Sequence, residues 1–147
     1  MAMKRTNDPW MKADEFGRSI PHGLGINLLV RDVAASAKFQ REIFAVETIY
    51  EDVDFCVQSG FGSQWLLHAD HTYLDHPMTG IIQPVETRGV GVELRLYGCD
   101  PDAAEARARD RDAIVLTGSI DKPHGLRECM IVDDDGYIWV PSIGLPA

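Results

Sequence analysis

The sequence predicts an α+β protein built from two tandem β-α-β-β-β modules. Two segments carry this prediction, because residues 23–30 and 89–97 each open with Gly-x-Gly and continue as an apolar run of strand length. An aspartate suited to a helix N-cap follows each run, Asp32 in the first and Asp100 in the second. Neither module can bury its sheet face alone, so each is expected to pair with another module.

The first module is assigned to residues 22–70. After Asp32, a helix is expected with Ala35, Phe39 and Ile43 on one face, at the spacing of an amphipathic helix. The pattern then changes to short β-rich pieces separated by the turn-forming residues Asp and Gly. These pieces are residues 47–52, 55–58 and 64–69.

The second module is assigned to residues 89–144 and repeats the same order. Pro101 suits the first position of a helix that is expected to continue over residues 102–111. Strands are expected at 113–120, 126–132 and 137–142, with an Asp-Asp-Asp-Gly turn in which Gly136 supplies a positive φ. Two further segments complete the expected organisation, an N-terminal arm at residues 1–21 and a turn-rich linker at residues 71–88.

Composition restricts the function classes. A chain of 147 residues with 45% hydrophobic content is expected to form one domain with an ordinary core. The formal net charge of −9 disfavours nucleic acid, whose phosphates require clustered Lys and Arg. No apolar run reaches the length of a membrane span, and the three cysteines form no C-x-x-C, so we expect a cytoplasmic protein with reduced thiols and no membrane partner.

Three local patterns, in this order along the chain, resemble those of the glyoxalase, bleomycin-resistance and extradiol-dioxygenase group, the vicinal oxygen chelate superfamily. They are VRDVAASAKF at 30–39, GVELRL at 91–96, and HGLR at 124–127 with DDDGYIW at 133–139. The resemblance implies curved mixed sheets that enclose a cleft, and a homodimer. It also implies that enzymes of the group hold a divalent metal through His, Glu or Gln on inward-facing strand positions.

The positions that match those ligands have lost most of their donors. Counting from Asp32 places the first-strand position at Gly25, and counting from Gly136 places the last at Val140. Glu93 keeps a carboxylate, and His68 is the nearest donor on the fourth strand. Since a lone carboxylate holds a metal poorly, we predict no catalytic metal and no other cofactor; if a metal binds, Glu93 and His68 are its expected ligands.

Strand parity selects the candidate ligand-binding residues. Leu94 and Leu96 form an apolar face suited to packing under the helix, so their neighbours on the strand should point into the cavity. A flat ligand could stack on an aromatic ring and pair a cationic group with a carboxylate. Trp139 is expected in the core, and His71 and His76 on the surface. The predicted ligand-binding residues are Asn27, Trp65, His68, Glu93, Arg95 and Tyr97.

Three functions are consistent with these residues. The favoured prediction is a binding protein that sequesters a small molecule in the cleft between the modules. The alternative is a divalent-metal-dependent lyase, isomerase or dioxygenase resembling glyoxalase I. A third is an interaction module whose cavity no longer binds a ligand.

Overall fold

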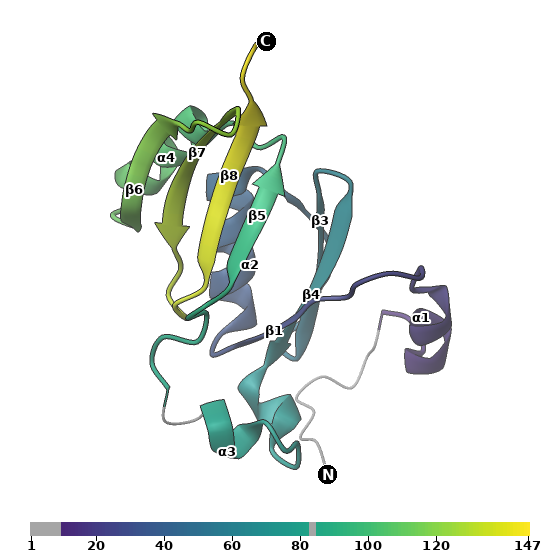
Figure 1. The fold of residues 1–147 in the computed structure, drawn as a ribbon. Helices are drawn as coiled ribbons and strands as arrows, with labels where there is room; N and C mark the ends of the chain where they lie inside the picture. Colours follow the sequence, from purple (N-terminus) through teal and green to yellow (C-terminus); the bar gives the residue numbers. More distant parts are fainter. Residues whose placement is uncertain (1–9, 83–84) are drawn as a thin grey trace.

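The computed structural model describes residues 10–82 and 85–147, and these form two four-stranded mixed sheets (Figure 1). The strand order is β1-β4-β3-β2 in the first sheet and β5-β8-β7-β6 in the second. In each sheet the first strand of the module pairs in parallel with the last, and the remaining pairs are antiparallel. The prediction of an α+β fold with two β-α-β-β-β modules is therefore confirmed.

The first module follows the predicted order. Helix α2 begins as expected, because the Asp32 side chain accepts a hydrogen bond of 3.0 Å from the backbone N–H of Ala35. It ends at Ala45, whose left-handed φ of 60° lets its N–H bond to the carbonyl of Arg41. The elements are β1 (Asn27–Val30), α2 (Val33–Phe44), β2 (Glu47–Glu51), β3 (Phe55–Gly60) and β4 (Ser63–Ala69).

The second module repeats this order. Asp100 caps its helix through the N–H groups of Asp102 and Ala103, with Pro101 in the first turn. Gly136 has a φ of +88°, and a Cβ there would lie 2.6 Å from the Cα of Thr87, so only glycine fits. The elements are β5 (Glu93–Tyr97), α4 (Pro101–Asp110), β6 (Ile114–Asp121), β7 (Leu126–Val132) and β8 (Ile138–Gly144).

The arm and the linker contain short helices that the sequence pattern did not predict. They are α1 (Ala13–Ser19) in the arm, and η1 (Asp70–Tyr73) and α3 (Thr79–Ile82) in the linker. None reaches eight residues, which is too short for a periodic apolar pattern to identify. Residues 1–9 of the arm and 83–84 of the linker lie outside the described part of the chain.

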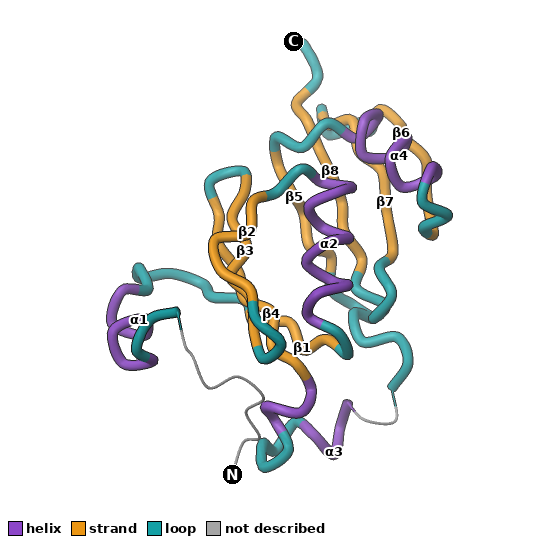
Figure 2. The backbone as a smooth tube through the Cα atoms, turned by 180° about the vertical axis from the view of Figure 1, so that it is seen from behind, coloured by secondary structure: helices purple, strands orange, loops and turns teal. Residues whose placement is uncertain are grey.

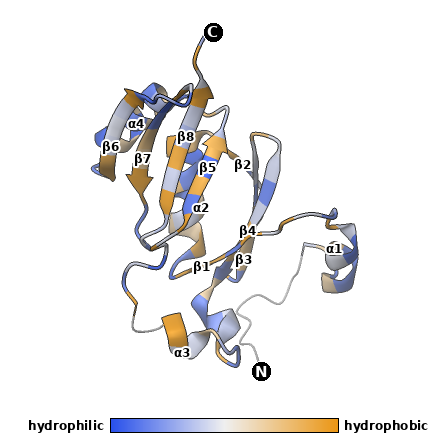
Figure 3. Ribbon diagram, viewed as in Figure 1, coloured by the Kyte–Doolittle hydropathy of each residue, from blue (hydrophilic) through white to orange (hydrophobic). Residues whose placement is uncertain are grey.

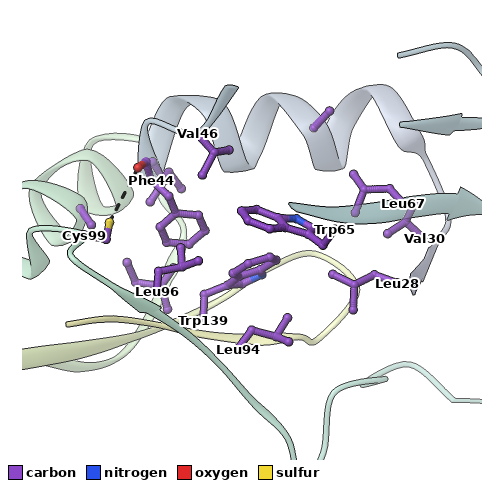
Figure 4. Packing of buried hydrophobic residues seen from close by; sticks show 14 of the residues in the cluster. Leu28, Val30, Phe44, Val46, Trp65, Leu67, Leu94, Leu96, Cys99 and Trp139 are labelled. Atoms are coloured by element: carbon purple, nitrogen blue, oxygen red, sulfur yellow. Dashed lines mark hydrogen bonds between the residues drawn. The ribbon is translucent and has the colours of Figure 1, made fainter. Parts of the chain in front are cut away.

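A single apolar core joins the modules. Trp139 is buried, as expected, and its ring centre lies 5.3 Å from that of Phe44 at the end of α2 and 5.8 Å from that of Trp65 on β4 (Figure 4). Figure 3 shows apolar and polar residues alternating along β5, the strand of the second sheet nearest to the first module. The core therefore continues through β5 and β8 from one module into the other.

Partly buried ionic contacts fix the two modules to each other. The carboxylate of Asp135, in the final turn, accepts hydrogen bonds from the backbone N–H and the guanidinium of Arg31, at 3.1 and 3.0 Å, and from the hydroxyl of Ser36. In the linker, Arg88 donates to both carboxylate oxygens of Asp70 at 2.7 Å. The final turn of the second module thus contacts the start of α2, and the end of the linker contacts the residue that follows β4.

Across residues 10–82 and 85–147, we find no helix whose length and hydropathy would let it cross a membrane.

Candidate functional site

A hollow of about 370 Å³ lies where the two modules meet, and we call it the junction cavity. On one side it is lined by the first module, including Ile26 just before β1, Leu28 on β1 and Trp65 on β4. On the other side lies β5, which is the edge strand of the second sheet. Because β5 has a free edge, side chains from both of its faces reach the cavity.

The alternation along β5 follows the predicted parity. Leu94 and Leu96 are buried, whereas Glu93 and Tyr97 are exposed and Arg95 is half-buried. Tyr97 is 59% exposed, so its ring is available at the rim of the cavity. An apolar floor and a polar, aromatic rim therefore come from one five-residue strand.

Arg95 is the centre of the charged part of this site. Its guanidinium donates a hydrogen bond of 2.8 Å to Glu93 and a second hydrogen bond to Glu128 on β7, and it lies 5.7 Å from the centre of the Tyr97 ring. Partial burial acts to lower the pKa of Arg95, but the hydrogen bonds to Glu93 and Glu128 outweigh it and raise the pKa. The site therefore holds a permanent cation between two carboxylates.

The charged residues also line a second hollow of about 310 Å³ on the face of the second sheet opposite α4. Here Glu93 and Arg95 are joined by Lys122, His124 and Glu128. The imidazole of His124 lies 3.6 Å from the carboxylate of Glu128. Glu128 was not among the predicted site residues, although a lone carboxylate in the apolar strand 126–132 was a signal that could have identified it.

Trp65 lies beneath the junction cavity rather than at its rim. Its side chain points to the face of the first sheet that α2 covers, and only 6% of the residue is exposed. The indole N–H donates a hydrogen bond of 3.0 Å to the side-chain oxygen of Gln40 on α2. Trp65 therefore offers a ligand little surface, and Tyr97 presents the accessible ring.

Asn27 and His68 lie apart from the other predicted residues. Asn27 lines a neighbouring hollow of about 320 Å³ between the 20–26 segment and β4. His68 is on the opposite face of the first sheet from α2, with its ring centre 5.8 Å from that of Phe55. The structure thus brings Trp65, Glu93, Arg95 and Tyr97 together around the junction cavity and leaves Asn27 and His68 outside it.

The residues do not fit a divalent metal at the positions that the resemblance implies. Gly25 has no side chain, and Val140 is a buried apolar residue in β8. The Glu93 carboxylate is paired with Arg95, and His68 packs against Phe55. Within the part of the chain that the structure describes, no three His, Cys, Asp or Glu side chains gather as a metal-binding group.

The surface position expected for His71 is wrong. Helix η1 turns the chain back onto the first module, so the His71 side chain is only 13% exposed and its Nε2 lies 2.8 Å from the buried carboxylate of Asp54. His76 is exposed, as expected, and its Nδ1 accepts a hydrogen bond from the backbone N–H of Met78. No local pattern indicates the His71–Asp54 contact, which depends on how the linker folds.

Comparison with known proteins identifies the fold. No model of a known protein family matches the chain, and no curated protein matches its sequence. Among solved structures, an enzyme of the glyoxalase/bleomycin resistance protein/dioxygenase family from Burkholderia phytofirmans PsJN has a TM-score of 0.65 at 17% identity, over 82% of this chain and 96% of that one. A glyoxalase/bleomycin resistance protein/dioxygenase from Nocardioides has a TM-score of 0.64 at 18% identity, over 91% and 93% of the two chains.

A third similar structure is FosX from Listeria monocytogenes, described as a genomically encoded fosfomycin resistance protein. Its TM-score is 0.62 at 16% identity, over 85% of this chain and 94% of that one. These identities are too low to transfer an activity. They show that this chain has the fold of the glyoxalase/bleomycin resistance protein/dioxygenase proteins, as the sequence resemblance implied.

Proposed function

We propose that this protein binds a small molecule in the junction cavity and sequesters it without a catalytic metal. The observation that carries the proposal is the arrangement of Arg95, held between Glu93 and Glu128 beside the exposed ring of Tyr97. A concave, mostly apolar hollow with a few convergent polar groups is the usual form of a small-molecule site. One of the similar structures, FosX, is named as a fosfomycin resistance protein, which supports a small molecule as the ligand.

The chemistry of the cavity indicates the class of ligand. Leu94, Leu96 and Trp139 supply an apolar floor, and Tyr97 supplies a ring on which a flat group can stack. The Glu93 carboxylate is exposed on one side and could exchange part of its contact with Arg95 for a cationic group of the ligand. We therefore propose a flat aromatic ligand that carries a positive charge.

A ligand-binding screen tests the proposal. The midpoint temperature of thermal unfolding should rise with increasing concentration of a cationic aromatic compound that binds. A ligand that binds only the folded state stabilises that state. Tyr97→Ala and Glu93→Gln should each weaken the binding of a hit about tenfold, whereas Ile81→Ala, at an exposed position on α3, should leave it unchanged. A hit whose affinity is the same in all three variants would place the binding site elsewhere.

A metal titration tests the alternative function. Protein purified without chelators should be titrated with Ni²⁺, Zn²⁺, Fe²⁺ and Mn²⁺, with Glu93→Ala as the comparison. Tight stoichiometric binding that Glu93→Ala abolishes would overturn the sequestration proposal and favour a metal-dependent lyase, isomerase or dioxygenase.

We also propose that the protein forms a homodimer around this site. Apolar side chains are exposed at the rim of the junction cavity, among them Leu24 at 94% exposure, Ile26 and Phe61. A second copy would cover them and enclose the ligand more fully. Sedimentation velocity should give a dimer for the unmodified protein and a monomer for Leu24→Asp, and a monomeric unmodified protein would contradict the proposal.

A further inference from the structure

A second aromatic surface lies on the face of the first sheet opposite α2. Three side chains form it, Tyr50 on β2, Phe55 on β3 and His68 on β4, and we call them the aromatic face. The ring centres of Tyr50 and Phe55 are 5.4 Å apart, and those of Phe55 and His68 are 5.8 Å apart. None of these residues lines the junction cavity, so the aromatic face is a separate feature.

The N-terminal arm covers this surface with two rings of its own. Figure 2 shows α1 on one side of the first sheet and α2 on the other. Trp10 stacks on Tyr50 with ring centres 4.9 Å apart and an angle of 14° between the planes. Phe16 meets Phe55 edge-on at 5.9 Å. Trp10 therefore lies on the aromatic face as a flat aromatic ligand would, in a nearly parallel stack.

Little else in the described part of the arm attaches it to the sheet. Helix α1 has seven residues, none of them buried, and a helix of that length is marginal by itself. From Trp10 to Ser19, the hydrogen bonds stay within the arm, including those from Arg18 to Asp14 and from Ser19 to the carbonyl of Phe16. Trp10 itself remains 41% exposed. The described part of the arm is thus attached mainly through ring contacts, which an external ring can replace.

The connection between the arm and β1 allows the arm to move away. The 20–26 segment precedes the first strand and contains Gly23, whose φ of +139° is accessible to glycine and rarely to other residues. A Cβ added at Gly23 or Gly25 would meet no atom within 4 Å, so there is open space beside these two positions. Rotation at these glycines could carry α1 off the sheet without disturbing the core.

We propose that the aromatic face is a binding site for a flat bicyclic aromatic ring, and that Trp10 closes it as a built-in competitor. When the arm is in place, the indole of Trp10 occupies the site. When the arm is displaced, Tyr50 presents its ring to an external ligand, with Phe55 and His68 beside it. The affinity of the site for a ligand is then reduced by the fraction of molecules in which the arm is closed.

The proposed competition is tested by titrating indole into the full-length Trp10→Ala variant, in which the competing ring is absent. Trp10→Ala should bind indole with a dissociation constant at least tenfold lower than that of the unmodified protein, measured by calorimetry. The ring signals of Tyr50 and His68 should shift in NMR spectra during the titration. Cleavage by trypsin after Arg18 should also become faster in Trp10→Ala, because the arm is released. Ile81→Ala, which removes an exposed apolar side chain from α3, away from both sites, should behave like the unmodified protein.

Two further variants separate this site from the junction cavity. In the Trp10→Ala background, Tyr50→Ala should abolish indole binding and Tyr97→Ala should leave it unchanged. Loss of binding in the Tyr97 variant would overturn the proposal, because indole would then occupy the junction cavity. Equal affinity in Trp10→Ala and the unmodified protein would overturn it as well. The result does not depend on whether a cationic ligand binds at the junction cavity.

Discussion

The indole N–H of Trp139 donates a hydrogen bond of 2.9 Å to the buried carboxylate of Asp133. The same carboxylate accepts hydrogen bonds from the backbone N–H groups of Asp135 and Tyr137, so it organises the turn between β7 and β8. This contact links the central tryptophan of the core to the Asp-Asp-Asp-Gly turn that identifies the fold in the sequence.

Asp133 should give the protein a specific pH dependence. Burial raises the pKa of Asp133 from 3.8 to about 6, and its hydrogen bonds only partly offset this effect. A raised carboxyl pKa stabilises the folded state below about pH 4, and this contribution is lost as the pH rises through about 6. The difference in pKa corresponds to at most about 3 kcal/mol.

Comparison of unfolding free energies between pH 4 and pH 7 tests this assignment. Asp133→Asn removes the titrating group, so its destabilisation relative to the unmodified protein should be larger at pH 4 than at pH 7. Asp134→Asn, at the exposed neighbouring position, should show no such trend. A destabilisation by Asp133→Asn that stays constant with pH would contradict the assignment.

Asp135→Ala should loosen the contact between the modules. It removes a buried carboxylate that binds the backbone and side chain of Arg31 and the hydroxyl of Ser36. We expect a loss of about 2–3 kcal/mol in the free energy of unfolding, measured by urea denaturation. Asp14→Ala breaks an exposed ion pair with Arg18 and serves as the control, which should leave stability unchanged. Equal stability of both variants would mean that the Asp135 contacts do not hold the modules together.

The repeated order of strand, capped helix and three strands predicted the architecture, because local signals in the sequence mark each of these elements. Asp32 and Asp100 cap their helices through hydrogen bonds within three residues, and the positive φ of Gly136 belongs to its own turn. Strand parity likewise predicted that Leu94 and Leu96 would be buried. Such features can be predicted without knowing which distant segments of the chain pack against them.

The site was harder to predict because it depends on contacts between distant segments. Glu128 binds Arg95 from 33 positions away, and His71 reaches Asp54 only because η1 folds back. Trp65 was expected at a ligand, but its hydrogen bond to Gln40 fixes it beneath the cavity. Each of these contacts depends on how two elements pack against each other. The periodicity of residues within one element does not predict that packing.

The three cysteines should be unreactive in the folded protein. Cys56, Cys99 and Cys129 are free and buried, and burial raises the pKa of Cys56 and Cys129 to about 12 and that of Cys99 to about 11. The thiolate is the reactive form, so almost none is present at pH 8. A thiol reagent such as dithionitrobenzoate should label none of them within minutes, and all three after unfolding in urea. Rapid labelling of the native protein would show that the core opens readily.

Replacing Arg95 should create a site for a divalent cation. The guanidinium separates Glu93 from Glu128, and His124 lies 3.6 Å from the Glu128 carboxylate. Arg95→Met removes the permanent cation and leaves the Glu93 and Glu128 carboxylates and the His124 imidazole lining one hollow, where they can move together. These are donor types that bind Zn²⁺ and Ni²⁺. Calorimetry should therefore show at least a tenfold gain in Ni²⁺ affinity over the unmodified protein. Arg95→Lys keeps a positive charge between the carboxylates and should show no gain. If both variants bind Ni²⁺ equally, the charge of Arg95 is not what keeps a metal out of this site.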